Sequence, residues 1–298
     1  MNKERLKKRN YKELFMSKIK IVTDSTVDLD QSLLEELEIE MIPLTITVDG
    51  QSYLDHVDYT STQFVEILEN AKEFPKTSQP AIGTFVELYE RLGKEGYEVL
   101  SIHMTSGMSG TVRAAQTAAT MVDTKVTVVD SQYISTALNF QVIEAAKMAK
   151  EGATVEEILP RLEHIRNNSF LYIMVDTLEY LKKGGRIGKA TAFLGSLLKI
   201  KPIAMLKDGA LEPVTKVRSH MQVIKQMLKY VEEDSAGKVI KGIGIAQLEA
   251  MELANKLKDS LLELRDDITN VPIYETGGVI GSHTGPNAFA LMYWVDEK

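Results

Sequence analysis

Short apolar segments and longer amphipathic segments alternate along the first half of the chain. Four apolar segments have the length and composition of buried strands: Ile19–Thr23, Met41–Val48, Val99–His103 and Val126–Val129. Between them, apolar residues recur every three or four positions, as from Phe64 to Ala71, which predicts helices. Strands that alternate with helices are typical of a parallel, doubly wound α/β sheet.

Polar residues predict where three helices begin. A Thr followed three residues later by Gln or Glu forms a capping box, and such pairs are Thr60 with Gln63, Thr84 with Glu87, and Thr154 with Glu157. We therefore expect helices that start directly after each of these threonines.

The second half departs from strict alternation. Gly152 is the best candidate for a domain boundary, which gives an N-terminal α/β domain at 18–152 and a C-terminal domain at 153–298. Asp208-Gly209 lies between the extended segments 202–206 and 211–217, which predicts a β-hairpin. Further strands are expected at 170–175, 239–246, 271–274 and 288–295, so the C-terminal domain is predicted to be mixed α/β.

Composition restricts the classes of function. The 35 basic and 42 acidic residues give a formal net charge of −7, which argues against general affinity for nucleic acid. Cysteine is absent, which excludes disulfides and thiolate metal ligands and fits a cytoplasmic protein. No apolar run approaches the roughly 18 residues that span a bilayer. The Lys/Arg-rich segment 1–17 has no continuous apolar core, so we interpret it as a disordered leader, with a basic docking tail as the alternative.

Turns that carry hydroxyl groups follow three predicted strands: Asp24-Ser25-Thr26, Ser106–Thr111 and Asp130-Ser131. In an open parallel sheet, ligands bind at the carboxyl ends of the strands, where such turns gather. Two further segments, Thr77-Ser78-Gln79-Pro80 and Gly281–Pro286, add neutral donors and a histidine. Hydroxyls and free helix N–H groups suit a small anionic head group, so these segments predict a carboxylate cradle. The histidines lack metal-ligand spacing, and no metal site is predicted.

Each candidate residue also has a simpler interpretation. Ser109 can merely cap the following helix, Thr77 can lie in a plain loop, and His283 can be an ordinary surface or core group. Placed beside a carboxylate, however, His283 would have a raised pKa and favour imidazolium. The segment Gly107–Thr111 nearly matches the G-x-S-x-G elbow of serine hydrolases, except that Thr111 replaces the last glycine. A serine esterase that uses Ser109 and His283 is therefore the alternative function.

Two neighbouring segments raise further possibilities. Leu181–Lys189 is basic and rich in glycine, which suits either a partner or phosphate site or a solvated helix end. The segment Ala192–Ile200 has more apolar residues than one narrow helical stripe needs. It is typical of a core helix and could also form the wall of an apolar tunnel.

These motifs in this order resemble the DegV family of bacterial lipid-binding proteins, from about Lys18 to the end of the chain. The resemblance is carried by five motifs: Asp24–Leu29, Thr77–Pro80, Ser106–Thr111, Leu178–Ile187 and Gly281–Pro286. The chain resembles in particular the fatty-acid-binding subunits of bacterial fatty acid kinase.

The resemblance implies a two-domain α/β fold that holds one long-chain fatty acid in an apolar tunnel and needs no cofactor. It implies that the carboxylate is bound by Thr77, Ser109 and His283, and that the cradle is completed by Ser25, Ser78, Gly110 and Ser282. A separate ATP-dependent kinase subunit would phosphorylate the bound carboxylate to an acyl phosphate for phospholipid synthesis. The kinase would dock at Arg186 and Arg218, and the protein itself would be non-catalytic.

Two positions depart from the family pattern. Asn287 stands where glycine is common, which is tolerable because Asn adopts left-handed conformations more easily than most residues. Val112-Arg113 follows Thr111 where an aromatic residue is usual, so the surroundings of the head group are expected to differ.

Overall fold

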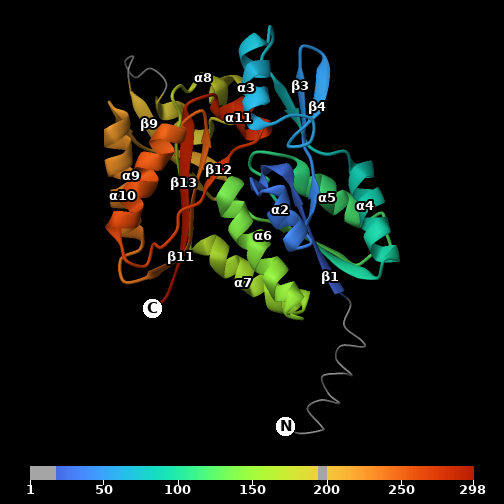
Figure 1. The fold of residues 1–298 in the computed structure, drawn as a ribbon. Coiled ribbons are helices and arrows are strands. Elements are labelled where there is room, and N and C mark those ends of the chain that lie inside the picture. The colour runs from blue at the N-terminus through green and yellow to red at the C-terminus, as the bar shows by residue number, and fades with distance from the viewer. Residues whose placement is uncertain (1–17, 194–199) are drawn as a thin grey trace.

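The computed structural model describes residues 18–193 and 200–298 (Figure 1). The predicted leader 1–17 and most of the apolar segment 192–200 lie outside the described residues. One sheet consists of parallel strands in the order β2 (Glu40–Ile42), β1 (Lys18–Asp24), β6 (Tyr97–His103) and β7 (Val126–Asp130). The predicted parallel sheet is confirmed.

Helices cover both faces of this sheet. On one face, Ile21 and Leu100 pack in one core cluster with residues of α2 (Gln31–Glu36), α6 (Ser135–Lys150) and α7 (Val155–Asn167). On the other face, Val22 and Val99 pack with residues of α4 (Ile82–Lys94) and α5 (Thr111–Ala119). Successive residues of a strand point to opposite faces, so Ile21 and Val22 belong to different cores. The sheet is therefore doubly wound, as its sequence predicts.

The strand predicted at Met41–Val48 is two strands in different sheets. The first, β2, ends at Ile42, and β3 (Thr45–Val48) pairs antiparallel with β4 (Gln51–Leu54) and β5 (Lys76–Ser78) in a small third sheet. Pro43 separates the two strands, because proline has no N–H group to donate to a sheet ladder. The prediction of one continuous strand was wrong. Helix α3 (Ser61–Asn70) follows β4.

The C-terminal half contains a six-stranded mixed sheet. Its strands, in spatial order, are β10 (Ala210–Val217), β9 (Lys201–Lys207), β8 (Ser169–Met174), β13 (Ala288–Asp296), β11 (Val239–Leu248) and β12 (Ile273–Glu275). Only the β11–β12 pair is parallel. Helices α9 (His220–Asp234) and α10 (Met251–Leu264) pack on one face of this sheet. The prediction of a mixed α/β C-terminal half is confirmed.

Local signals for turns and helix starts are mostly confirmed. Asp208 and Gly209 join β9 to β10 with φ of 49° and 78°, as a tight hairpin turn requires. Thr60 and Thr154 both form complete capping boxes. The box predicted at Thr84 was wrong, because α4 starts two residues earlier, just after Pro80 and Ala81. Asn287 has a left-handed φ of 59°.

The two halves are packed together through α6 and α11 (Gly278–Thr284). Leu138 and Val142 of α6 belong to the core of the parallel sheet, whereas Ala137 belongs to the core of the mixed sheet. Helix α11 follows β12 and packs against α8 (Glu179–Lys183), α3, β3 and β5 (Figure 1). A helix from the end of the chain thus lies against the small N-terminal sheet. The domain boundary near Gly152 stays a prediction.

Candidate functional site

A cavity of about 320 Å³ lies where the parallel sheet, the small sheet, α8, α11 and the β9–β10 hairpin meet. This volume is in the range of small-molecule sites. Its apolar lining comes from both halves of the chain and comprises Leu44, Met104, Met108, Ile134, Leu171, Ile173, Leu181, Leu206, Leu211, Val279 and Ile280. Its polar lining comprises Thr77, Ser78, Gln79, Ser109, Gly110, Arg186, His283 and Thr284.

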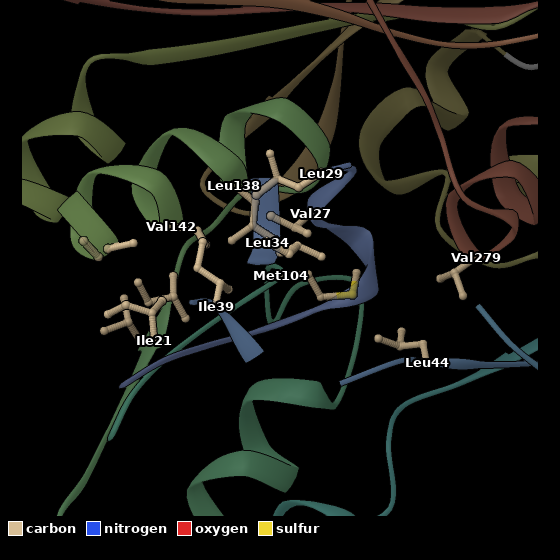
Figure 2. Close-up of a cluster of buried hydrophobic side chains, with 14 of the residues drawn as sticks. Ile21, Val27, Leu29, Leu34, Ile39, Leu44, Met104, Leu138, Val142 and Val279 are labelled. Carbon is tan, nitrogen blue, oxygen red and sulfur yellow. The ribbon is translucent and has the colours of Figure 1, made fainter. Parts of the chain in front are cut away.

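Part of the apolar wall is continuous with the protein core. Leu44, Met104 and Val279 line the cavity and belong to the cluster of buried side chains shown in Figure 2. Because protein cores are packed as densely as organic crystals, this wall has a fixed shape.

Thr77 and His283 form the central contact of the polar lining. Thr77 Oγ1 lies 2.9 Å from His283 Nε2, although the two residues are 206 positions apart in the sequence. Thr77 is held in β5, where it pairs with Ile46 of β3. His283 lies in the last turn of α11. The packing of α11 on the small sheet therefore brings the two side chains together.

Ser109 lies in the turn between β6 and α5. Its hydroxyl bonds with Thr111 Oγ1 at 2.8 Å and accepts a hydrogen bond from the Thr111 N–H at 3.3 Å. The turn is fixed from the other half of the chain, because Thr105 Oγ1 donates to Gly209 O at 3.0 Å. The N-cap residue of α5 is Gly110 and not Ser109, and α5 has no side-chain capping bond. Ser109 lines the cavity.

The surroundings of His283 favour its neutral form. Burial, together with the positive charge of Arg186, lowers the pKa of His283 from 6.5 to about 4. The predicted rise toward imidazolium applies to a site that holds a carboxylate. The second ring nitrogen, Nδ1, is buried and has no hydrogen-bond partner among the described residues.

Arg186 lies closer to the cavity than its predicted docking role requires. The side chain is half-buried and lines the cavity. Its Nε donates to Met108 O at 3.1 Å and its Nη1 to Gly184 O at 2.7 Å. Arg186 therefore ties the Ser109 turn to the end of α8. Its positive charge also favours an anion in the cavity.

The other predicted site residues are divided between the cavity and the rest of the molecule. Ser78 and Gly110 line the cavity. Ser25 does not, because it donates to Asp55 Oδ2 at 2.9 Å, and Ser282 donates to Gly278 O within α11 at 2.7 Å. Arg218 is exposed at the end of β10. It lines a separate groove that also contains Lys216, Lys225 and Lys229.

The serine-hydrolase alternative lacks its geometry. Such an enzyme needs a serine bonded to a histidine base that is oriented by a third group. In the described part of the chain, Ser109 Oγ bonds with Thr111 and not with His283, whose Nδ1 has no partner. The arrangement does not favour hydrolysis.

No pattern in the sequence indicated a buried row of four hydrogen-bonded polar side chains. Asp24 Oδ2 lies 3.0 Å from His103 Nδ1, His103 Nε2 lies 2.7 Å from Ser101 Oγ, and Ser101 Oγ lies 2.8 Å from Tyr89 OH. The order Asp–His–Ser is that of a hydrolase triad, but all four side chains are fully buried and none lines the cavity. Asp24 also accepts from the Met104 N–H at 2.9 Å. This row of hydrogen-bonded side chains therefore joins the ends of β1 and β6.

Neither a metal centre nor a membrane-spanning helix is found in residues 18–193 and 200–298. No group of three or more His, Asp or Glu side chains there is arranged to hold a metal ion. No helix in those ranges has the length and apolar character needed to cross a bilayer.

Comparisons with known proteins extend over nearly the whole chain. The profile of a family described as "Uncharacterised protein, DegV family" matches residues 18–296. A DegV domain-containing protein of Staphylococcus aureus (strain N315) is 44% identical over 277 residues, or 93% of this chain and 99% of the relative. A fatty-acid-binding DegV family protein from Thermus thermophilus has a TM-score of 0.88 at 35% identity, over 93% of this chain and 99% of that one. DegV of Bacillus subtilis, a fatty acid binding protein, has a TM-score of 0.85 at 34% identity, over 94% of this chain and 100% of that one.

Proposed function

The chain belongs to the DegV family, and we propose that it binds one long-chain fatty acid. The carboxylate would lie at Thr77, Ser109 and His283, and the tail would extend along the apolar wall of the cavity. Ser25 and Ser282 are left out of this proposal because neither lines the cavity. The observation that carries it is the contact between Thr77 and His283 at the polar end of an otherwise apolar cavity. The fatty-acid-binding activity of two structural neighbours supports it.

Tail and head group would contribute differently to binding. Burying about 15 methylenes at about 0.8 kcal/mol each is worth roughly 12 kcal/mol before the costs of ordering. Each hydrogen bond to the carboxylate adds about 1.5–3 kcal/mol and fixes its position. The tail therefore supplies most of the affinity, and the head group supplies orientation.

Analysis of the bound lipid tests this proposal directly. Native mass spectrometry of the purified protein, followed by solvent extraction, should show one long-chain fatty acid per chain. A protein that stays empty after incubation with excess fatty acid would contradict the proposal.

Substitutions at the polar end test the assignment of residues. Thr77→Ala combined with Ser109→Ala should weaken binding of the fatty acid at least tenfold, because two hydroxyl donors are lost. Thr47→Ala is the matched control, since Thr47 lies in the neighbouring strand β3, bonds with Ser52 and does not line the cavity. Unchanged affinity in the double variant would remove both residues from the site.

We further propose that the protein is a cytoplasmic, non-catalytic carrier that presents the carboxylate to a separate kinase. The kinase would form an acyl phosphate that feeds phospholipid synthesis. The apolar lining supports this division of labour, because it shields the tail while the polar end holds the reactive group. In a reconstituted assay, the loaded protein, ATP and the kinase should yield acyl phosphate. Acyl phosphate formed without the kinase would refute the non-catalytic role.

Docking through Arg186 and Arg218 is part of the same proposal. Arg218 is exposed in a groove with three lysines, which suits an acidic partner surface. Arg218→Glu should raise the KM for the loaded protein and leave its fatty acid content unchanged. Because Arg186 also lines the cavity, Arg186→Glu should in addition lower fatty acid affinity. Unchanged kinetics for either variant would exclude that arginine from docking.

A further inference from the structure

Two buried carboxylates outside the cavity meet the first residues of α11, the helix that carries His283. The Asp55 carboxylate is fully buried and accepts hydrogen bonds from Gly278 N at 2.9 Å and Val279 N at 3.3 Å. It also accepts from Ser25 Oγ at 2.9 Å and Tyr59 OH at 2.8 Å. Asp55 therefore joins the small N-terminal sheet region to the start of α11.

Asp28 bonds to the residues just before this helix. It is 3% exposed and accepts from Gly277 N at 3.1 Å and Thr276 Oγ1 at 2.9 Å. It also accepts from Ser135 Oγ at 2.5 Å. Its backbone has a left-handed φ of 48°, which is uncommon for a residue other than glycine. Three successive N–H groups, from residues 277 to 279, are thus held by two carboxylates.

His56 compensates the charge of these carboxylates. Its Nε2 lies 3.6 Å from Asp28 Oδ1. Burial alone would lower the pKa of His56, but the interactions with Asp28 and Asp55 outweigh it and raise the pKa to about 9. Burial raises the pKa of the Asp55 carboxyl, and the positive charge of the neighbouring His56 opposes that rise.

The helix transmits this anchoring to the cavity. A rise of 1.5 Å per residue puts His283 only about 8 Å along the axis from Gly278. The helix is seated without space to slide, because a Cβ at Gly278 would lie 2.6 Å from both Phe64 Cδ2 and Tyr59 OH. From these contacts we propose that Asp28 and Asp55 are positioning residues that hold His283 at Thr77.

The proposal rests on the fatty acid function described above and assigns a role to the Asp24–Leu29 motif. That motif contributes no group to the cavity lining, yet Ser25 bonds to Asp55 and Asp28 bonds to α11. Buried charged groups are weak sources of stability, since apolar residues of similar volume often pack as well or better. A positional role accounts for two buried carboxylates at this helix end.

The test compares binding of hexadecanoic acid with binding of hexadecanol, which has the same tail and no carboxylate. The variants are Asp55→Asn and Asp28→Asn, which keep the side-chain shape and one acceptor oxygen. Asp30→Asn is the matched control, because Asp30 is exposed in the same segment and makes no side-chain capping bond. Both affinities are measured by calorimetry on the full chain.

We expect the wild type and the Asp30→Asn variant to prefer the acid. In the two test variants, that preference should fall on the order of tenfold, with hexadecanol affinity within twofold of the wild type. A merely destabilised protein would lose both ligands together. A folded Asp55→Asn variant that keeps the full preference would overturn the proposal, whereas a wild type without any preference would overturn the fatty acid function itself.

If the Asp28→Asn and Asp55→Asn variants do not fold, a third variant tests the same proposal. Gly277→Ala changes no charge, and its Cβ would lie 2.4 Å from His56 Nε2 and 2.8 Å from Asp55 Oδ1. The backbone there, with φ of −68°, accepts alanine. The same fall in preference is expected, and an unchanged preference counts against the proposal in the same way.

Discussion

A single methyl group at position 184 should displace His283 from Thr77. The Cβ of an alanine at Gly184 would lie 2.0 Å from His283 Nδ1 and 2.7 Å from Cε1. Ordinary contacts begin at about 3.4 Å, so the ring must withdraw by roughly 1.4 Å. The backbone of Gly184, with φ of −75° and ψ of −10°, is helical and accepts alanine without strain. The new Cβ would also lie 3.1 Å from Tyr180 O, so Gly184→Ala acts mainly on the imidazole ring and only slightly on the backbone.

The displacement has a calculable effect on binding. The hydrogen bond of 2.9 Å between His283 Nε2 and Thr77 Oγ1 cannot survive a withdrawal of that size. Without it, the Thr77 hydroxyl loses its orientation toward a bound carboxylate. A hydrogen bond to a charged group is worth about 1.5–3 kcal/mol, so affinity for a long-chain fatty acid should fall roughly 10- to 100-fold.

Displacement of a fluorescent fatty acid measures this change, and thermal unfolding checks the fold. Gly83→Ala is the matched control, because Gly83 lies in α4 and an alanine methyl group there would have no described atom within 4 Å. The control should keep its affinity and gain about 0.5–1 kcal/mol of stability, since alanine favours a helix over glycine. A folded Gly184→Ala variant with wild-type affinity would refute the reasoning.

Three further predictions concern stability. The pKa of His283 is about 4 in the folded protein and 6.5 in the unfolded chain. The free energy of unfolding of the wild type should therefore fall by about 3 kcal/mol as pH falls from 6.5 to 4. Urea unfolding of His283→Gln should not show this fall. The effect of His56 on stability has the opposite dependence on pH, because its pKa in the folded protein is about 9. The contribution of His56 to the free energy of unfolding is complete below pH 6.5 and is lost as pH rises through 9. His56→Gln should abolish this loss. Gly107→Ala should cost about 1–3 kcal/mol in thermal unfolding, because its Cβ would lie 2.4 Å from Gly209 O.

The elements with a strong local period could be predicted from the sequence. The parallel strands β1, β6 and β7 are short apolar segments, and the hairpin at Asp208-Gly209 has its own turn signal. The small sheet could not be predicted, because β4 and β5 have four and three residues and mostly polar side chains. Such strands exist through pairing with β3, a tertiary contact that no local pattern specifies.

The site was predictable to a different degree. The segments that carry Thr77 and Ser109 stand out in the sequence, but the contact of Thr77 with His283 depends on the path of the whole chain. Asp28 lies in the Asp24–Leu29 motif, but nothing in the sequence indicated its role, and Asp55 gave no signal at all. Asp28 and Asp55 bond to residues 249 and 223 positions away, and an isolated aspartate in a turn is indistinguishable from a solvated one. Ser25 was predicted to complete the carboxylate cradle because it lies in a turn that carries hydroxyl groups. Its hydroxyl instead donates a hydrogen bond to Asp55.

The surroundings of His283 also determine which ring nitrogen carries the proton. Nδ1 is buried without a partner in the described structure, and buried N–H groups without a partner are rarer than buried acceptors without one. The proton is therefore expected on Nε2, which then donates to Thr77 Oγ1. The Thr77 hydroxyl is left free to donate its own proton to a carboxylate. Nitrogen-15 NMR of the ligand-free protein at pH 7 should show a neutral His283 protonated at Nε2. A proton found on Nδ1 would reverse the direction of the Thr77 hydrogen bond and leave the carboxylate without this donor.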